Sequence, residues 1–409
     1  MRQMVPLEEA NDLLLQLVHP LEEVEVDLLE AQGMVLARDV AADRPFPPFD
    51  SSPLDGFALR AADTAGVTLD KPCSLQVIET IGAGHAATHE VAPGTAIGIA
   101  TGAPVPQGAD CVVRFEDTRR DGERVLVQLP LSPGQNVVRT GKEFASGTVL
   151  LNSGQTIDPA AIGILAAVGR RTVAVHKRPR VAVFSTGDEL VLPGQVLPFG
   201  KIFASNRYAV AAQVTKAGGQ PILLDSAPDL EDAVASSYRQ GLTQADIVIS
   251  TGGASVGRRD VIKSAMRKAG AEIIFWKAAF KPGTAVVFGL SNAGVLAGLS
   301  GNPTSGMVTF ALLVRPLLRR LGGHRELFLP RLEGYLSQDY PKGAKARHFV
   351  QARTWWQNQI MTCPVGLPGT GAFRSTIDSN SLIDLPAGHG PLQAGERVSL
   401  VLLGQLLAQ

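Results

Sequence analysis

The spacing of apolar residues changes along the chain and divides it into regions of different predicted structure. Apolar residues between positions 7 and 18 recur at helical spacing. From about residue 20 to 175, short apolar segments are separated by turns rich in glycine and proline, which predicts a β-rich region. Residues 156–168 within it predict a helix, because a proline stands near the start and a glycine at the end.

From about residue 179 the pattern changes to apolar strands that alternate with helices. Strands are expected at 181–184, 222–224, 247–249, 273–276 and 286–289, and helices at 206–217, 230–242, 260–269 and 303–321. This order predicts a doubly wound, mostly parallel α/β sheet, whose ligands bind at the carboxyl ends of the strands. Beyond residue 327, alternation in "ARHFVQARTWW" and "ERVSLVLL" predicts a small C-terminal β domain.

Composition limits the classes of partner. The chain has 38 basic and 38 acidic residues, so no bulk positive charge favours nucleic acid or an anionic membrane surface. Its three cysteines lie far apart, which indicates neither a disulfide framework nor a zinc site. Acidic residues interrupt the N-terminal apolar stretch, and no later segment is long enough to span a bilayer, so we expect a cytoplasmic protein.

Three glycine-containing loops follow predicted strands of the α/β region. They are "STGDEL" (185–190), "STGGASVGRRD" (250–260) and "GLSGNPTSG" (298–306). Free backbone N–H groups at such turns bind phosphate and other oxyanions. Each loop alone is equally explained as a tight turn between strand and helix, but three at one sheet edge favour an anionic ligand.

Charged residues lie beside these loops. Asp188, Glu189 and Asp260 are carboxylates next to a predicted phosphate site, and magnesium bridges carboxylate and phosphate oxygens. Helix capping explains Asp188 and Asp260 equally well. Lys281 follows a strand and precedes Pro282, so it is a candidate cation for an oxyanion, with a solvated loop lysine as the alternative.

Ser255 lies in Gly-Ala-Ser-Val-Gly, which fits the nucleophile elbow of a serine hydrolase. An elbow serine follows its strand directly, whereas residues 250–252 are expected to intervene here. The available histidines, His324, His348 and His389, fall in or near the C-terminal β region rather than in loops of the α/β sheet. These two observations favour an anion cradle over a hydrolase.

Two polar turns precede the α/β region. "FPPFDSSPLDGFALR" carries Asp55, and "ATGAPVPQGADCVV" carries Thr101. Two interpretations of these turns are open. They are plain hairpin connections, or they complete a cleft contributed by another domain or subunit.

At these residues the chain resembles the MoeA family of molybdopterin molybdenumtransferases, which includes the gephyrin E domain. The resemblance covers nearly the whole chain, and five motifs in family order carry it: "FDSSPLDGFALR", "IATGAPVPQGADCVVRFEDT", "PRVAVFSTGDEL", "DIVISTGGASVGRRD" and "GLSGNPTSG". It implies the last step of molybdenum cofactor assembly, in which molybdate is inserted into adenylylated molybdopterin and AMP is released with a divalent metal, Mg²⁺, present.

The resemblance also implies an elongated homodimer, with a cleft built from both subunits, and the molybdopterin adenylyltransferase is a candidate partner. The implied domains are a linker domain (1–45 and 139–178), a β-rich domain (46–138), a molybdopterin-binding α/β domain (179–326) and a C-terminal β domain (327–409). The implied catalytic positions are Asp55, Thr101, Asp188, Glu189, Asp260 and Lys281, with metal at Asp188, Glu189 and Asp260. The implied substrate-binding positions are Gly187, Gly252, Gly253, Ser255, Gly257, Gly301, Asn302, Pro303 and Ser305.

Four residues depart from the family pattern. Ser226 stands where the family has aspartate, unless Asp225 takes its place, and Thr284 stands where it has a second lysine. Ser300 replaces a proline and Lys142 a glutamate. Losing a lysine beside a dianion costs about 1 to 3 kcal/mol if the contact is a charge-assisted hydrogen bond. The departures therefore leave open a carrier or sensor that does not catalyse, or a site tuned to tungstate.

Overall fold

A computed structural model describes residues 2–253, 259–366 and 373–408, and the chain divides into two compact units. Unit 1 comprises Met1–Arg38, Gly154–Pro159 and Thr172–Gln409, and unit 2 comprises Asp39–Ser153 and Ala160–Arg171. Among the described residues, no helix has the length and apolar character needed to cross a membrane.

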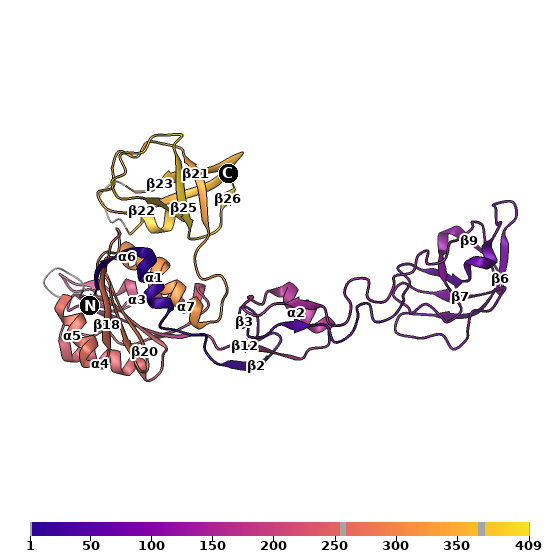
Figure 1. The fold of residues 1–409 in the computed structure, drawn as a ribbon, viewed down its shortest axis with the longest axis horizontal. Helices are drawn as coiled ribbons and strands as arrows, with labels where there is room; N and C mark the ends of the chain where they lie inside the picture. The colour runs from indigo at the N-terminus through magenta and orange to yellow at the C-terminus, as the bar shows by residue number, and fades with distance from the viewer. Residues whose placement is uncertain (1, 254–258, 367–372, 409) are drawn as a thin grey trace. The chain divides into compact units, whose positions relative to one another are not determined.

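Unit 1 contains a seven-stranded sheet in the order β1-β18-β19-β20-β17-β13-β16. Two of its strands, β18 and β20, are labelled in Figure 1. The strands are β1 (Arg2–Val5), β13 (Arg180–Thr186), β16 (Gln220–Leu223), β17 (Ile247–Gly252), β18 (Glu272–Ala278), β19 (Val287–Ser291) and β20 (Gly294–Leu299). All pairings are parallel except the two that β19 makes with β18 and β20. This confirms the predicted mostly parallel α/β sheet.

Helices cover both faces of this sheet because its buried strands are apolar on both sides. The helices are α1 (Leu7–Leu15), α3 (Ser205–Lys216), α4 (Glu231–Leu242), α5 (Arg259–Lys268), α6 (Pro303–Thr309) and α7 (Arg315–Leu321). In β13, Val181 and Val183 pack into one core with α1, α3 and α7, and Ala182 and Phe184 pack into the other with α4 and α5. A π-helical turn, η3 (Phe310–Val314), joins α6 to α7.

The predicted strands of this sheet were incomplete in two places. β20 was missed because its two glycines, its alanine and the serine that follows it resemble a loop, although its residues are almost all buried. β1 was missed because three of its four residues are exposed at the sheet edge. β17 is also longer than predicted, since it runs to Gly252 rather than ending at residue 249.

The C-terminal part of unit 1 is a second β structure, as expected. Its strands have the order β23-β21-β25-β24-β22-β26, and an additional pairing of β22 with β23 closes the sheet on itself. The elements are β21 (Arg331–Leu336), β22 (His348–Gln357), β23 (Gln359–Pro364), α8 (Ser375–Asp378), β24 (Ser381–Leu385), β25 (Arg397–Leu402) and β26 (Leu407–Ala408). Phe349, Leu382 and Val401 join the core of the α/β sheet, so the two parts of unit 1 share apolar packing.

Smaller sheets complete unit 1. Its remaining strands are β2 (Glu23–Asp27), β3 (Val35–Leu36) and β12 (Thr172–His176), which form one sheet, and β14 (Leu190–Val191) and β15 (Ile202–Phe203), which pair with each other. The last pair closes the loop that leaves β13.

Unit 2 is mostly β structure around a six-stranded sheet in the order β8-β5-β7-β6-β10-β9. Its elements are β4 (Val40–Ala41), β5 (Gly56–Leu59), η1 (Ala61–Thr64), β6 (Cys73–Ile81), β7 (Thr95–Ile99), β8 (Cys111–Arg114), η2 (Phe115–Asp117), β9 (Thr118–Asp121), β10 (Arg124–Val127) and β11 (Val149–Leu151). Helix α2 (Pro159–Ala167) begins at the boundary between the units and agrees with the helix predicted at 156–168. The boundaries expected for four domains stay a prediction.

Candidate active site

The loop that leaves β13 carries the two acidic residues predicted beside the first glycine turn. Asp188 and Glu189 are both exposed, and Gly187 precedes them. Two contacts hold the loop: the Lys201 ammonium donates to the Asp188 carbonyl, and the Ile202 amide donates to the Glu189 carbonyl at 2.9 Å. The backbone of this loop is therefore fixed while its carboxylates remain accessible.

The loop after β16 supplies a carboxylate that the sequence interpretation missed. The Thr186 hydroxyl donates to Asp229 Oδ1 at 2.7 Å, and the Asp229 amide lies 3.3 Å from Asp188 Oδ1. Asp229 thus joins two adjacent loops at this sheet edge, and among the described residues the buried Ser226 hydroxyl has no hydrogen-bond partner. The only signal was an acidic residue after a strand at the same sheet edge.

The second and third glycine loops meet at their backbones. A Cβ added to Gly301 would lie 3.3 Å from Gly252 Cα, and one added to Gly252 would lie 2.1 Å from the Thr186 carbonyl oxygen. Gly252 also has a φ of +110°, which disfavours other residues. The predicted cradle residues Gly252 and Gly301 are therefore brought together because neither has a side chain.

Asn302 has a structural role that the prediction did not assign to it. Its Oδ1 accepts a hydrogen bond from the Ser305 amide at 3.1 Å, which caps helix α6 before Pro303. The Ser300 hydroxyl accepts from the Asn302 amide at 3.2 Å, so this departure from the family pattern supports the same loop. Asn206 Nδ2 also donates to the Gly301 carbonyl at 2.7 Å.

Lys281 is held by backbone pairing with the C-terminal part of unit 1. Its amide donates to the Arg347 carbonyl at 2.9 Å, and its carbonyl accepts from the Phe349 amide at 2.7 Å. The ring of Phe280 packs edge-on against Phe349, with 5.6 Å between centroids. The backbone at Lys281 is therefore positioned by the first residues of β22.

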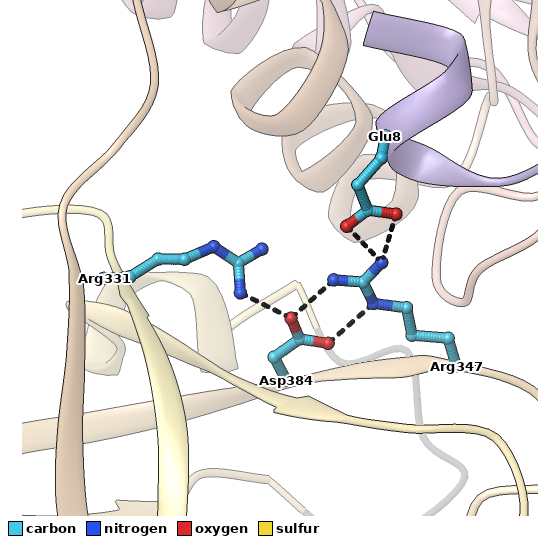
Figure 2. A network of polar contacts seen from close by, with 4 residues as sticks. All are labelled: Glu8, Arg331, Arg347 and Asp384. Atoms are coloured by element: carbon cyan, nitrogen blue, oxygen red, sulfur yellow. Dashed lines mark hydrogen bonds and ion pairs between the residues drawn. The ribbon is translucent and has the colours of Figure 1, made fainter. Parts of the chain in front are cut away.

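An ionic network fixes the start of β22 from the other side (Figure 2). Arg347 donates through Nε and Nη2 to the two carboxylate oxygens of Asp384, at 2.8 and 2.7 Å, and through Nη1 to Glu8. Arg331 donates to the same Asp384 at 2.7 Å. The Arg347 side chain thus links α1 to β24. Its backbone carbonyl accepts the hydrogen bond from Lys281.

The larger of two cavities at these loops has a volume of about 410 Å³ and combines predicted with unpredicted residues. The predicted ones are Lys281, Asn302 and Ser305. The unpredicted ones include Lys342 and His348, which come from a different part of the chain. Its described lining residues include no aspartate or glutamate, so this cavity is basic.

The smaller cavity, of about 90 Å³, lies on the other side of the same loop. Its lining includes the predicted residues Glu189, Gly252, Gly301 and Pro303. Hydroxyls of Ser185, Thr186, Ser205 and Thr251 are also in the lining. Gly253 approaches the Thr186 side chain, with 3.3 Å between its hypothetical Cβ and Thr186 Cγ2. Residues 300–305 are therefore shared by a basic cavity and one with a carboxylate and hydroxyls.

Asp55 and Thr101 lie together in unit 2. Asp55 Oδ1 accepts from the Thr101 amide at 2.8 Å and from its hydroxyl at 3.0 Å. These bonds, the amide first, lower the pKa of the Asp55 carboxyl. The two polar turns found in the sequence thus form one exposed pair, in which an ionised Asp55 carboxylate accepts hydrogen bonds from Thr101.

Some predicted site residues lie outside the described part of the chain. Ser255 and Gly257 do, and Asp260 is placed only as the second residue of α5, with nothing shown of its side chain. The longer β17 removes the argument that residues 250–252 separate Ser255 from its strand. His348 also begins a strand that pairs with the Lys281 loop, contrary to the expected separation.

Three family descriptions match successive parts of the chain. The MoeA N-terminal region (domain I and II) matches residues 5–169, a probable molybdopterin binding domain matches 182–320, and the MoeA C-terminal region (domain IV) matches 333–403. The chain belongs to the MoeA family. The resemblance drawn from five sequence motifs is confirmed.

Relatives of this MoeA chain match it over nearly its full length. A protein of Bacillus subtilis (strain 168) named molybdopterin molybdenumtransferase is 34% identical over 404 residues, covering 98% of this chain and 94% of its own. One of the same name from Haemophilus influenzae is 34% identical, covering 99% and 100%. The solved structure of a molybdopterin biosynthesis MoeA protein from Pyrococcus horikosii matches with a TM-score of 0.87 at 30% identity, covering 98% of this chain and 100% of its own.

Proposed function

We propose that this chain is a molybdopterin molybdenumtransferase that inserts molybdate into adenylylated molybdopterin and releases AMP. One observation carries the proposal: residues 300–305 line two cavities of different charge. The basic cavity suits an oxyanion, and the one with Glu189 suits a phosphate-bound metal. A reaction that joins a metal oxyanion to a phosphorylated pterin needs both kinds of site side by side.

The basic cavity supplies what a tetrahedral dianion requires. Lys281 provides a positive charge, and the hydroxyls of Ser300, Thr304 and Ser305 can donate hydrogen bonds. The Thr304 hydroxyl is buried and has no hydrogen-bond partner among the residues that the structure describes, so a bound oxyanion would satisfy it. Lys281 thereby holds molybdate where the dithiolene sulfurs replace its oxygens.

The carboxylates Asp188 and Glu189, with Asp260 on α5, would hold Mg²⁺. No group of three His, Cys, Asp or Glu side chains in the described ranges could hold a metal by itself. Magnesium fits nonetheless, because it is usually bound through one or two carboxylates together with substrate phosphates and water. When bound, the metal would neutralise charge on the phosphoanhydride as AMP leaves. Gly252 and Gly301 line the cavity that contains Glu189, next to the place proposed for the phosphates.

Asp55 and Thr101 are proposed to act on the site of a partner subunit in a cytoplasmic homodimer. Both are exposed, and their mutual hydrogen bonds preorganise the carboxylate in an ionised form. An ionised, fixed carboxylate suits a role in binding metal or orienting the substrate. The molybdopterin adenylyltransferase is proposed as the partner that supplies the adenylylated substrate.

The test is AMP release from adenylylated molybdopterin with Mg²⁺ and with molybdate, tungstate or neither. We expect release that depends on the oxyanion and on the metal. Lys281→Met is expected to lower kcat/KM for molybdate by about ten-fold or more, since a charge-assisted hydrogen bond is lost. Lys277→Met is the matched control. It removes the same charge from a lysine that lies over the Trp276 ring and does not line the basic cavity.

Each result bears on the proposal. Tight binding of the substrate with no AMP release in any arm would contradict it and would favour a carrier or sensor. Faster release with tungstate than with molybdate would keep the reaction class and change the metal. A fluorophosphonate label that disappears in Ser255→Ala would instead support the hydrolase interpretation.

A further inference from the structure

The basic cavity holds a second lysine to which neither the sequence motifs nor the comparisons assign a role. Lys342 lines the cavity together with Lys281 and His348. In the parts of the chain that the structure describes, no carboxylate lies within ion-pair distance of Lys281 or Lys342. Two unpaired ammonium groups at one cavity repel each other unless an anion lies between them. The cavity is therefore suited to a ligand with two negative charges.

The segment that carries Lys342 is anchored on both sides. Tyr340 and Leu392 exchange backbone hydrogen bonds of 2.9 Å in both directions. The Ala344 amide donates to the His389 carbonyl at 2.8 Å. Tyr340 and Ala344 are both buried. Lys342 stands midway between these two attachment points, so its backbone is held although its side chain is exposed.

The charges of both lysines act on His348, which lines the same cavity. Burial lowers the pKa of His348, and the charges of Lys342 and then Lys281 lower it further. The imidazole therefore stays neutral at physiological pH and offers a hydrogen bond without adding a third charge. The Lys281 backbone is bridged to His348, so the first residue of β22 lies beside the Lys281 loop.

Thr284 lines the same cavity but contributes no charge to it. Its hydroxyl donates to the Phe280 carbonyl at 2.6 Å, so its proton is already used within the loop. A second positive charge in this cavity must then come from another lining residue. Among the described lining residues, Lys342 is the other lysine.

We propose that Lys342 binds the oxyanion substrate together with Lys281 and sets the affinity of the cavity for a tetrahedral dianion. The inference rests on the proposed function in one respect, that the oxyanion is molybdate. Lys342 is a binding residue contributed by the C-terminal part of unit 1, so this part of the chain takes part in substrate recognition.

The experiment compares Lys342→Met with Lys345→Met in AMP release at varied molybdate. Lys345 is an exposed lysine three residues away that does not line the cavity. Its replacement therefore changes the net charge by the same amount without changing the cavity. Lys342→Met is expected to raise the KM for molybdate by about ten-fold or more, with little change in kcat at saturation. Lys345→Met is expected to keep the wild-type KM. Adding Thr284→Lys to Lys342→Met is expected to restore much of the affinity, because it returns a positive charge to the same cavity.

Direct binding separates failure of this inference from failure of the proposed function. Equilibrium dialysis of the full chain with tungstate measures oxyanion affinity whether or not AMP is released. Weaker binding by Lys342→Met than by Lys345→Met supports the role of Lys342 even if no variant turns over. An equal KM and equal binding in the two variants, or an equal loss in both, would overturn it. Wild-type chain that neither binds tungstate nor releases AMP would overturn both proposals.

Discussion

Replacing Asp384 by asparagine is expected to be the most damaging single change in the network that fixes β22. The Asp384 side chain is only 8% exposed and receives three hydrogen bonds from two arginines. Asparagine keeps the shape but removes the charge and turns an NH₂ group toward a guanidinium that can only donate. Arg347 and Arg331 would then be left in a partly buried site without a full counter-charge.

The magnitude follows from burial. Removing one partner of a buried ion pair costs about 3 to 5 kcal/mol, whereas an exposed pair contributes about 0 to 1 kcal/mol. The Glu8 side chain, which binds the same Arg347, is 64% exposed. Glu8→Gln is therefore the matched control, since it removes one negative charge from the same network at a solvated position. We expect Asp384→Asn to lower the free energy of unfolding by about 3 kcal/mol and Glu8→Gln by less than about 1 kcal/mol.

Urea unfolding followed by tryptophan fluorescence measures this difference. Trp355 and Trp356 lie on β22 and report on the C-terminal part of unit 1.

The contribution of Asp384 to the free energy of unfolding also depends on pH. Burial alone would raise the pKa of Asp384, but hydrogen bonds from Arg347 and Arg331 outweigh it and lower the pKa.

A lowered pKa in the folded state means that the unfolded chain takes up the proton first as pH falls. The stabilisation from Asp384 is therefore complete above the unfolded pKa of about 4 and is lost below it. In Asp384→Asn the stability should change less between pH 5 and pH 3 than in the wild type. An Asp384→Asn variant that is no less stable than Glu8→Gln at pH 7 would refute the reasoning.

Two further predictions concern the α/β sheet and its edge. Burial, and then two neighbouring arginines, lower the pKa of His324 to about 3, so the unfolded chain binds a proton below about pH 6.5 that the folded chain does not. Stability should therefore fall from pH 6.5 towards 4, and His324→Gln should flatten the slope in urea titrations by up to about 1.4 kcal/mol per pH unit. Gly252→Ala should lower stability by about 2 kcal/mol or more, since its Cβ would lie 2.1 Å from the Thr186 carbonyl oxygen. Gly163→Ala, in open space on a helix, is the control and should be neutral or stabilising in thermal unfolding.

The sequence was sufficient for the α/β sheet where local pattern and burial agree. Strands β13 and β17 are apolar on both faces because helices cover both sides, and such runs stand out between glycine turns. β20 did not stand out, since glycine and alanine give it low β-propensity and its burial comes from neighbours. The antiparallel direction of β19 could not be read from the sequence, because pairing direction depends on contacts between distant segments.

The site was predictable where its residues follow strands of one sheet. Glu189, Gly252 and Gly301 line one cavity because the carboxyl ends of β13, β17 and β20 meet at one edge. Lys342 and His348 could not be found in this way, since they come from a separate β structure whose position depends on Arg347 and Phe349. Asn302 was assigned to the substrate, and the capping bond to Ser305 shows that local structure also explains it. The functional roles of these residues remain predictions.

The overall neutrality of the chain makes the charge of the basic cavity informative. With 38 acidic and 38 basic residues, the average surface attracts neither sign of ligand. A dianion can then be held only where positive charges lie close together and nearby carboxylates are absent or already paired. Arg347 and Arg331 do not meet this condition, because Asp384 and Glu8 neutralise them. Lys281 and Lys342 do, because no described carboxylate pairs with either, so their charge remains available to a substrate.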